Sequence, residues 1–127
     1  MDAILRTAVR ERAAQCCEYC HRSQADSPLI AFHIEHIIPR KHLGSDRSDN
    51  LALACPDCNI RKGSDLTGID PEFGSVTRLF DPRAQNWDEH FVREGLRIVG
   101  RTAVGRTTVQ VLDLNSPARL RLRLATA

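Results

Sequence analysis

The chain has 127 residues, which is enough for one domain with a modest core and too few for two independent domains. Its 18 basic and 16 acidic residues give a formal net charge of +2, so charge alone does not indicate nucleic-acid binding. No apolar run approaches the roughly 20 residues that span a bilayer, and the arginine-rich N-terminus with Asp2 is unlike a secretory signal. We therefore expect a soluble, cytoplasmic protein, whose five cysteines favour metal binding over disulfides.

The first half of the chain predicts four elements. Residues 3–15 place apolar side chains at helical spacing, which predicts an amphipathic helix. The sequence LIAFHIEHI at 29–37 predicts a strand, which the following Pro39 limits. After a polar loop, LALA at 51–54 predicts a second strand. Pro56 suits the first turn of a helix and Gly63 suits its end, so the order over residues 30–63 is strand, loop, strand, helix.

The second half of the chain gives weaker signals. Residues 68–74 read as a turn-rich connector, and short strands are predicted at 75–80 and 96–102. The segment 87–92 fits either a helix or a strand, and 107–114 is ambiguous because its β-branched residues favour a strand while its spacing also fits a helix. We expect an α+β fold in which residues 1–127 form one domain and residues 64–127 pack on or beside the preceding unit.

Two cysteine pairs, Cys17-x-x-Cys20 and Cys55-x-x-Cys58, can supply four thiolates to one tetrahedral zinc ion. Such a site has no open position for a water, so its role is structural. Cys16 is the odd cysteine; a small buried apolar role is expected, although it could shift the ligand assignment by one position. The pairs are separated by residues 21–54, far more than the roughly 15–20 residues of a plain zinc ribbon. We therefore expect the segment between the pairs to carry the function.

That segment contains FHIEHIIPRKH, which reads as a polar strand edge, a zinc site, or an acid/base and metal centre. An imidazole has a pKa near neutrality and suits a general base, and a carboxylate suits a hard cation such as Mg²⁺. Glu35 and His36 supply both side by side. Adjacent strand residues point to opposite faces, so one shared site requires the strand to twist, bulge or end there. His33, on the Glu35 face, is a candidate metal ligand, phosphate contact or surface residue.

Other polar residues of this region have the chemistry to assist. Asn50 has an amide oxygen that can fix the tautomer of an imidazole. Asn59 and Lys62 are three residues apart on the predicted helix and so lie near one face. Lys62 or Arg61 could hold a phosphate oxygen. The candidate nucleic-acid contacts are Arg40, Lys41, His42, Arg61 and Lys62, for several of which a solvated surface explains the residue equally well.

The pattern Cys-x-x-Cys, Glu-His, Asn50-Leu51 and Cys-x-x-Cys-Asn59-x-x-Lys62 resembles the HNH endonuclease family, whose nuclease core is a ββα-metal motif. The resemblance covers residues 17–63. It implies that His36 is the general base, that Glu35 binds a catalytic cation, and that Asn50 orients His36. Asn59 stands where other members carry a histidine ligand. The resemblance further implies Mg²⁺ or Mn²⁺ as the catalytic cation, DNA as the partner, and hydrolysis that leaves a 5′-phosphate.

Two other function classes compete with a nuclease. A non-catalytic zinc module that binds nucleic acid or protein fits the modest net charge and the asparagine at position 59. A thiol redox enzyme would use the Cys-x-x-Cys pairs, but one metal ion accounts better for all four thiolates. The oligomeric state is open, because one nuclease motif cuts one strand and a double-strand break needs a dimer or two events.

Overall fold

The computed structural model describes residues 1–127 and begins with the helix α1, Ala3–Arg12. The side chain of Asp2 caps this helix by accepting a hydrogen bond from the backbone N–H of Leu5 at 2.7 Å. The helix is shorter than the predicted 3–15, because Ala14 and Gln15 adopt left-handed backbone angles, with φ of 53° and 59°, that reverse the chain. Val9 is buried and anchors α1 in the core.

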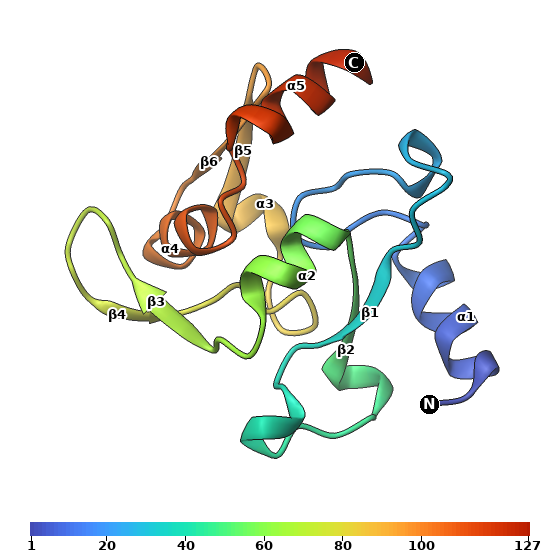
Figure 1. The fold of residues 1–127 in the computed structure, drawn as a ribbon. Coiled ribbons are helices and arrows are strands. Elements are labelled where there is room, and N and C mark those ends of the chain that lie inside the picture. The colour runs from blue at the N-terminus through green and yellow to red at the C-terminus, as the bar shows by residue number, and fades with distance from the viewer.

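The predicted strand–loop–strand–helix order is confirmed. The strands β1, His33–His36, and β2, Leu51–Ala54, pair antiparallel with Glu35 opposite Ala52 and His36 opposite Leu51. The helix α2, Pro56–Lys62, follows β2 directly and has Gly63 at its end, with φ of 50°. In Figure 1, α2 lies on one side of the β1–β2 pair and α1 on the other, and both helices contact the strands.

Strand β1 is shorter than the predicted 29–37 because the side chain of Gln24 forms hydrogen bonds with the backbone of the residues before it. The amide of Gln24 donates to the carbonyl of Ile30 at 2.7 Å and accepts from the N–H of Phe32 at 2.8 Å. Backbone groups held in this way are not available to pair with β2. Gln24 lies in a short 3₁₀ turn, Gln24–Asp26; two further 3₁₀ turns, Arg40–His42 and Ser48–Asn50, lie in the loop between the strands.

The outer edge of β2 has no third strand, and other parts of the chain satisfy its polar groups. The side chain of Arg12 donates to the carbonyl of Leu51 at 2.7 Å. The carboxylate of Glu18 accepts from the N–H of Leu53 at 2.8 Å, and the N–H of Glu18 donates to the carbonyl of Leu53. A two-stranded sheet can therefore be buried without leaving its backbone unpaired.

The second half of the chain forms small hairpins and helices around this unit. Its elements are β3 (Thr67–Ile69), β4 (Val76–Arg78), α3 (Trp87–His90), β5 (Phe91–Glu94), β6 (Arg97–Gly100), α4 (Ala103–Val111) and α5 (Pro117–Ala125). The two ambiguous segments are thereby resolved, since 87–92 divides between α3 and β5 and most of 107–114 lies in α4. The hairpin β3–β4 extends beyond α4, as Figure 1 shows. None of the helices is long and apolar enough to cross a membrane.

One hydrophobic cluster draws on both halves of the chain. Phe32, Leu51 and Leu53 come from the first half, and Phe80 and Phe91 from the second. The rings of Phe80 and Phe91 pack edge to face, with their centroids 5.2 Å apart. The predicted α+β class, with a small core unit, an N-terminal helix and a C-terminal extension, is therefore confirmed.

The hairpin β3–β4 is tied to α4 by an ion pair that predicts a pH dependence of stability. Both carboxylate oxygens of the buried Asp70 accept from the Arg106 guanidinium, at 3.0 and 2.9 Å. The hydrogen bonds from Arg106 lower the pKa of Asp70. A lowered pKa means that the pair stabilises the fold above the unfolded-state value of about 3.9 and that this contribution is lost as pH falls through the folded value.

We therefore expect Asp70→Asn to lower the free energy of unfolding at pH 7, and the difference from wild type to shrink as pH falls below about 4. Urea unfolding at several pH values measures both effects. The exposed Asp65, which makes no ion pair, provides the control Asp65→Asn, for which no pH-dependent difference is expected. Equal stability of Asp70→Asn and wild type at pH 7 would contradict the role of the pair.

Candidate metal and nuclease sites

Four buried cysteines, two from the turn after α1 and two from the start of α2, form one cluster. The sulfur atoms of Cys17, Cys20, Cys55 and Cys58 all lie within 4.8 Å of one another. The sulfurs of Cys20 and Cys55 are 3.7 Å apart. A tetrahedral site with metal–sulfur bonds of about 2.3 Å requires sulfur separations of about 3.8 Å, so the cluster fits such an ion. Cys16 is not a member and instead forms an isolated backbone bridge with Ser23.

Local structure delivers the two cysteine pairs to this point. Cys17 and Cys20 lie in a tight turn that His21 closes with a left-handed φ of 65°, and its N–H donates to the carbonyl of Cys17. Cys55 caps α2, and its sulfur accepts from the N–H of Cys58 at 3.4 Å. The first turn of a helix therefore presents two sulfurs on one side.

The thiols do not ionise alike without a metal. Burial raises the pKa of Cys17 and of Cys58 well above the ordinary value. Hydrogen bonding, above all with Cys17, lowers the pKa of Cys20 and brings that of Cys55 to about 7. A bound divalent ion is what would hold all four groups as thiolates, because metal binding displaces the remaining protons.

A second, open site lies between the end of β1 and α2. It is a hollow of about 380 Å³, lined by Ile34, Glu35, His36, Pro39, Arg40, Asn59 and Gly63. Four of the polar residues singled out in the sequence thus line one hollow: Glu35, His36, Arg40 and Asn59. Glu35 and His36 share it although they are adjacent in a strand, because β1 ends at His36 and the chain turns away there.

Glu35 forms a buried ion pair with Lys62. It is 5% exposed, and its Oε1 lies 2.5 Å from the Nζ of Lys62, which is 2% exposed. Its Oε2 accepts from the hydroxyl of Tyr19 at 2.7 Å. Burial raises the pKa of Glu35, and the charge of Lys62 opposes this shift. The pair joins β1 to α2 in the interior of the motif.

The position of Lys62 differs from the expected phosphate contact. Its Nζ also donates to the carbonyls of His36 and Ile37, at 3.2 and 2.9 Å. With these partners the ammonium faces the interior, and a phosphate in the hollow would reach it only after it leaves Glu35. The same ion pair means that the Glu35 carboxylate is not free to bind a cation in this arrangement.

His36 is held by a residue that the sequence did not indicate. Its Nε2 lies 2.7 Å from Oδ1 of Asp46, whose two oxygens also accept from Arg40 at 2.9 and 3.1 Å. The hydrogen bonds with His36 and then Arg40 lower the pKa of Asp46. Asp46 lies in a polar loop that also contains Asp49, and no spacing in the sequence distinguishes the two.

Asn50 does not contact His36, in contrast to the expected role. Its buried amide accepts from the N–H of Ile38 at 2.8 Å and donates to the carbonyls of Ile38 and Ser45, at 3.0 and 2.8 Å. Gly44 makes this closure feasible, because a Cβ there would lie 1.6 Å from the carbonyl oxygen of Ile38. Asn50 therefore closes the loop that carries Asp46, and any influence on His36 passes through that loop.

The remaining predicted contacts lie around the hollow or outside it. Arg40, Lys41 and His42 form one exposed 3₁₀ turn beside the hollow. The exposed Arg61 lies near Asp113, with 3.5 Å between Nη2 and Oδ2. His33 is exposed at the start of β1 and does not line the hollow.

The Glu35–Lys62 pair predicts a large effect on stability. Lys62→Met leaves a buried carboxylate without its cation, and we expect a loss of about 3–5 kcal/mol in the free energy of unfolding. Adding Glu35→Gln should recover much of this loss, because the neutral amide needs no counter-charge and still accepts from Tyr19. Urea unfolding of the single and double variants measures both effects.

The exposed neighbour Arg61 provides the matched control for this experiment. Arg61→Met should change stability by less than about 0.5 kcal/mol. A Lys62→Met protein as stable as that control would show that the pair contributes nothing.

Comparison with known proteins adds one finding. Residues 17–65 match the family model described as HNH endonuclease. Searches among curated proteins and among solved structures gave no match to the chain. The matched segment contains both cysteine pairs, both strands of the β1–β2 pair and the whole of α2. Residues 17–65, with four cysteines placed to bind a metal ion, are therefore similar to the HNH endonuclease family.

Proposed function

We propose that this protein is a metal-dependent endonuclease that hydrolyses phosphodiester bonds in DNA. The observation that carries the proposal is the pairing of His36 with Asp46 at the edge of the hollow that Asn59 also lines. The His36 side chain is 18% exposed, so water can reach it. The HNH family match over the same residues supports the assignment.

His36 acts in this proposal as the general base that removes a proton from the attacking water. Asp46 is ionised because its pKa is lowered, so its oxygen accepts from the Nε2–H of His36. This fixes the tautomer in which Nδ1 carries the free lone pair. The arrangement lets the imidazole accept a proton at Nδ1 while the carboxylate stabilises the resulting charge.

Asn59 and Glu35 are the residues that would hold the catalytic Mg²⁺ or Mn²⁺. Both line the hollow and offer oxygen atoms, the ligands that hard cations prefer. When bound, the cation would neutralise charge on the phosphate and assist departure of the leaving oxygen. Glu35 could take part only by exchanging Lys62 for the cation, so the fit rests first on Asn59.

The exposed turn of Arg40, Lys41 and His42 would contact the DNA backbone. Arg40 lines the hollow and Lys41 and His42 follow it in the same turn, so cations here would compensate the charge of phosphates near the scissile bond. In the four-cysteine cluster we propose zinc in a structural role, because four thiolates fill a tetrahedral shell and leave no position for a reacting water.

A non-catalytic module that binds nucleic acid is the second candidate, and the Glu35–Lys62 pair favours it. A carboxylate already neutralised by an internal lysine has little need of a cation. This candidate predicts DNA binding that survives chelation of loosely held cations and no cleavage with any divalent metal.

Replacement of His36 tests the nuclease proposal most directly. His36→Gly should lower plasmid nicking at least about 100-fold with Mg²⁺ or Mn²⁺, because a general base contributes roughly that much. Its zinc content should equal that of wild type. Added imidazole should restore part of the activity of His36→Gly and should not affect wild type. Nicking by His36→Gly at the wild-type rate would remove His36 as the base.

Replacement of Asp46 tests whether it positions His36. We expect Asp46→Asn to lower kcat about tenfold or more with little change in KM, because the amide cannot stabilise the protonated imidazole. Asp49→Asn is the matched control and should keep full activity, because Asp49 lies in the same loop but pairs with Arg47 and not with His36. If both variants retain wild-type kcat, the contact between Asp46 and His36 has no part in the reaction.

A further inference from the structure

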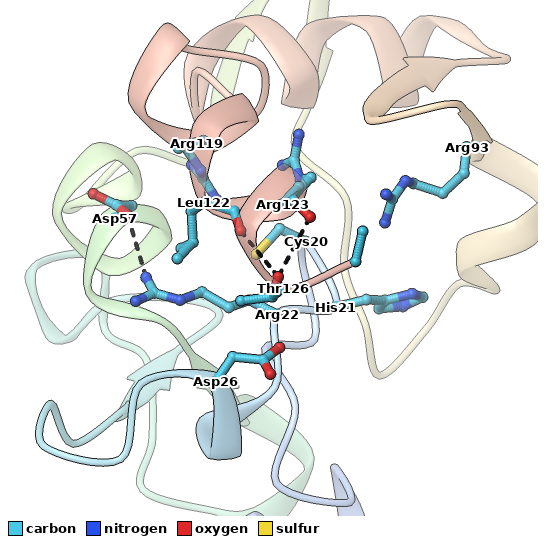
Figure 2. A pocket seen from close by; sticks show the side chains of 11 residues that line it. Cys20, His21, Arg22, Asp26, Asp57, Arg93, Arg119, Leu122, Arg123 and Thr126 are labelled. Carbon is cyan, nitrogen blue, oxygen red and sulfur yellow. Dashed lines mark hydrogen bonds and ion pairs between the residues drawn. The ribbon is translucent and has the colours of Figure 1, made fainter.

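Helix α5 brings a guanidinium into contact with the four-cysteine cluster. The Nη2 of Arg119 lies 2.9 Å from the sulfur of Cys58 and 3.8 Å from that of Cys55. Its Nη1 donates to the carbonyl of Leu112 at 2.8 Å, which fixes the plane of the group. Arg119, Arg123 and Cys20 line a cavity of about 220 Å³. Figure 2 shows Arg119 and Arg123 extending from α5 at one side of it.

Arg119 has no carboxylate partner. It is 7% exposed, and its acceptors are two sulfurs and one backbone carbonyl. Two aspartates line the cavity, Asp26 and Asp57; Asp57 pairs with Arg22, and neither forms an ion pair with Arg119. Burial of a guanidinium without a counter-charge is strongly unfavourable. The counter-charge of Arg119 must therefore come from thiolates of the cluster.

The contact compensates a buried charge on each side, the guanidinium of Arg119 and the thiolates of the metal-bound cluster. Four thiolates around a divalent ion carry a net charge of about −2, which is itself costly to bury. One guanidinium at hydrogen-bond distance from a sulfur halves that charge. The guanidinium of arginine stays protonated in proteins, so Arg119 supplies this positive charge.

The position of Arg119 is set by the C-terminal extension and not by the HNH segment. Ser116 caps α5 by accepting from the N–H of Arg119 at 3.3 Å. One turn later, Arg123 donates to the carbonyl of Leu96 at 3.1 Å and to the side chain of Asn115 at 3.2 Å. These bonds fasten α5 to the β5–β6 hairpin and so direct Arg119 toward the sulfurs.

We propose that Arg119 is a positioning residue of the metal centre, whose N–H···S bond to Cys58 strengthens metal binding and slows metal release. The C-terminal extension would then form part of the metal site, although all four ligands lie within residues 17–58. The proposal rests on metal binding by the four cysteines and not on nuclease activity.

The test uses the full chain loaded with zinc and compares Arg119→Leu, Arg119→Lys and wild type. Loss of an outer-shell partner costs about 10–100-fold in metal affinity, and we expect Arg119→Leu to fall in this range. Zinc transfer to a chromogenic chelator should be faster by a similar factor. Arg119→Lys, which keeps the charge without the planar fork, should be intermediate. The matched control is Arg121→Leu, on the exposed face of the same helix, which should match wild type.

Replacing zinc with cobalt gives an absorption spectrum that would not change if Arg119 only stabilised the fold. An N–H···S bond stabilises the sulfur lone pair, so its loss should shift the thiolate-to-cobalt charge-transfer band of Arg119→Leu to lower energy. Arg119→Lys provides this comparison if Arg119→Leu does not fold. Unchanged affinity and spectrum in the Arg119 variants, or equal changes in Arg121→Leu, would overturn the proposal. So would a wild-type protein that binds neither metal. None of these measurements depends on DNA cleavage. A protein that does not cleave DNA would therefore contradict the proposed nuclease function without bearing on the role of Arg119.

Discussion

The structure depends on one constraint, which is that four sulfur atoms from two parts of the chain lie within 4.8 Å of one another. The turn after α1 is thereby held against the first turn of α2. The intervening segment must leave and return to the same point, and it does so as the β1–β2 pair with its long loop. The hollow lies at the far end of this pair, where the loop begins. The cysteine cluster thus determines where the polar residues of the hollow are displayed.

The parts of the fold that could be predicted are those whose signals are local. LALA specifies β2, and Pro56 with Gly63 specifies both ends of α2. The grouping of Glu35, His36 and Asn59 around one hollow was also accessible, because the order of elements in a cysteine-closed unit leaves few arrangements. The ambiguous segment 107–114 shows the limit, since burial against the β5–β6 hairpin, and not intrinsic propensity, places most of it in a helix.

The features that could not be predicted depend on partners distant in the sequence. Lys62 points inward because a buried carboxylate on β1 attracts it, and a basic residue near the end of a helix reads equally well as exposed. Asp46 reaches His36 only because Asn50 and the close approach at Gly44 fold the loop back. Arg119 contacts a cysteine 61 residues earlier, and no periodicity connects the two. In each case the side chain contacts a partner that only the tertiary structure brings within reach.

The proposed role of the contact between Arg119 and Cys58 implies an order of events in folding. As the chain is synthesised, all four metal ligands emerge well before α5, so the segment can capture an ion while its charge is still uncompensated. Docking of α5 comes later and closes a long loop. If Arg119 strengthens metal binding as proposed, the centre matures in two stages. Its final affinity for the ion then depends on whether the entire chain, and not only residues 17–65, has reached its native state.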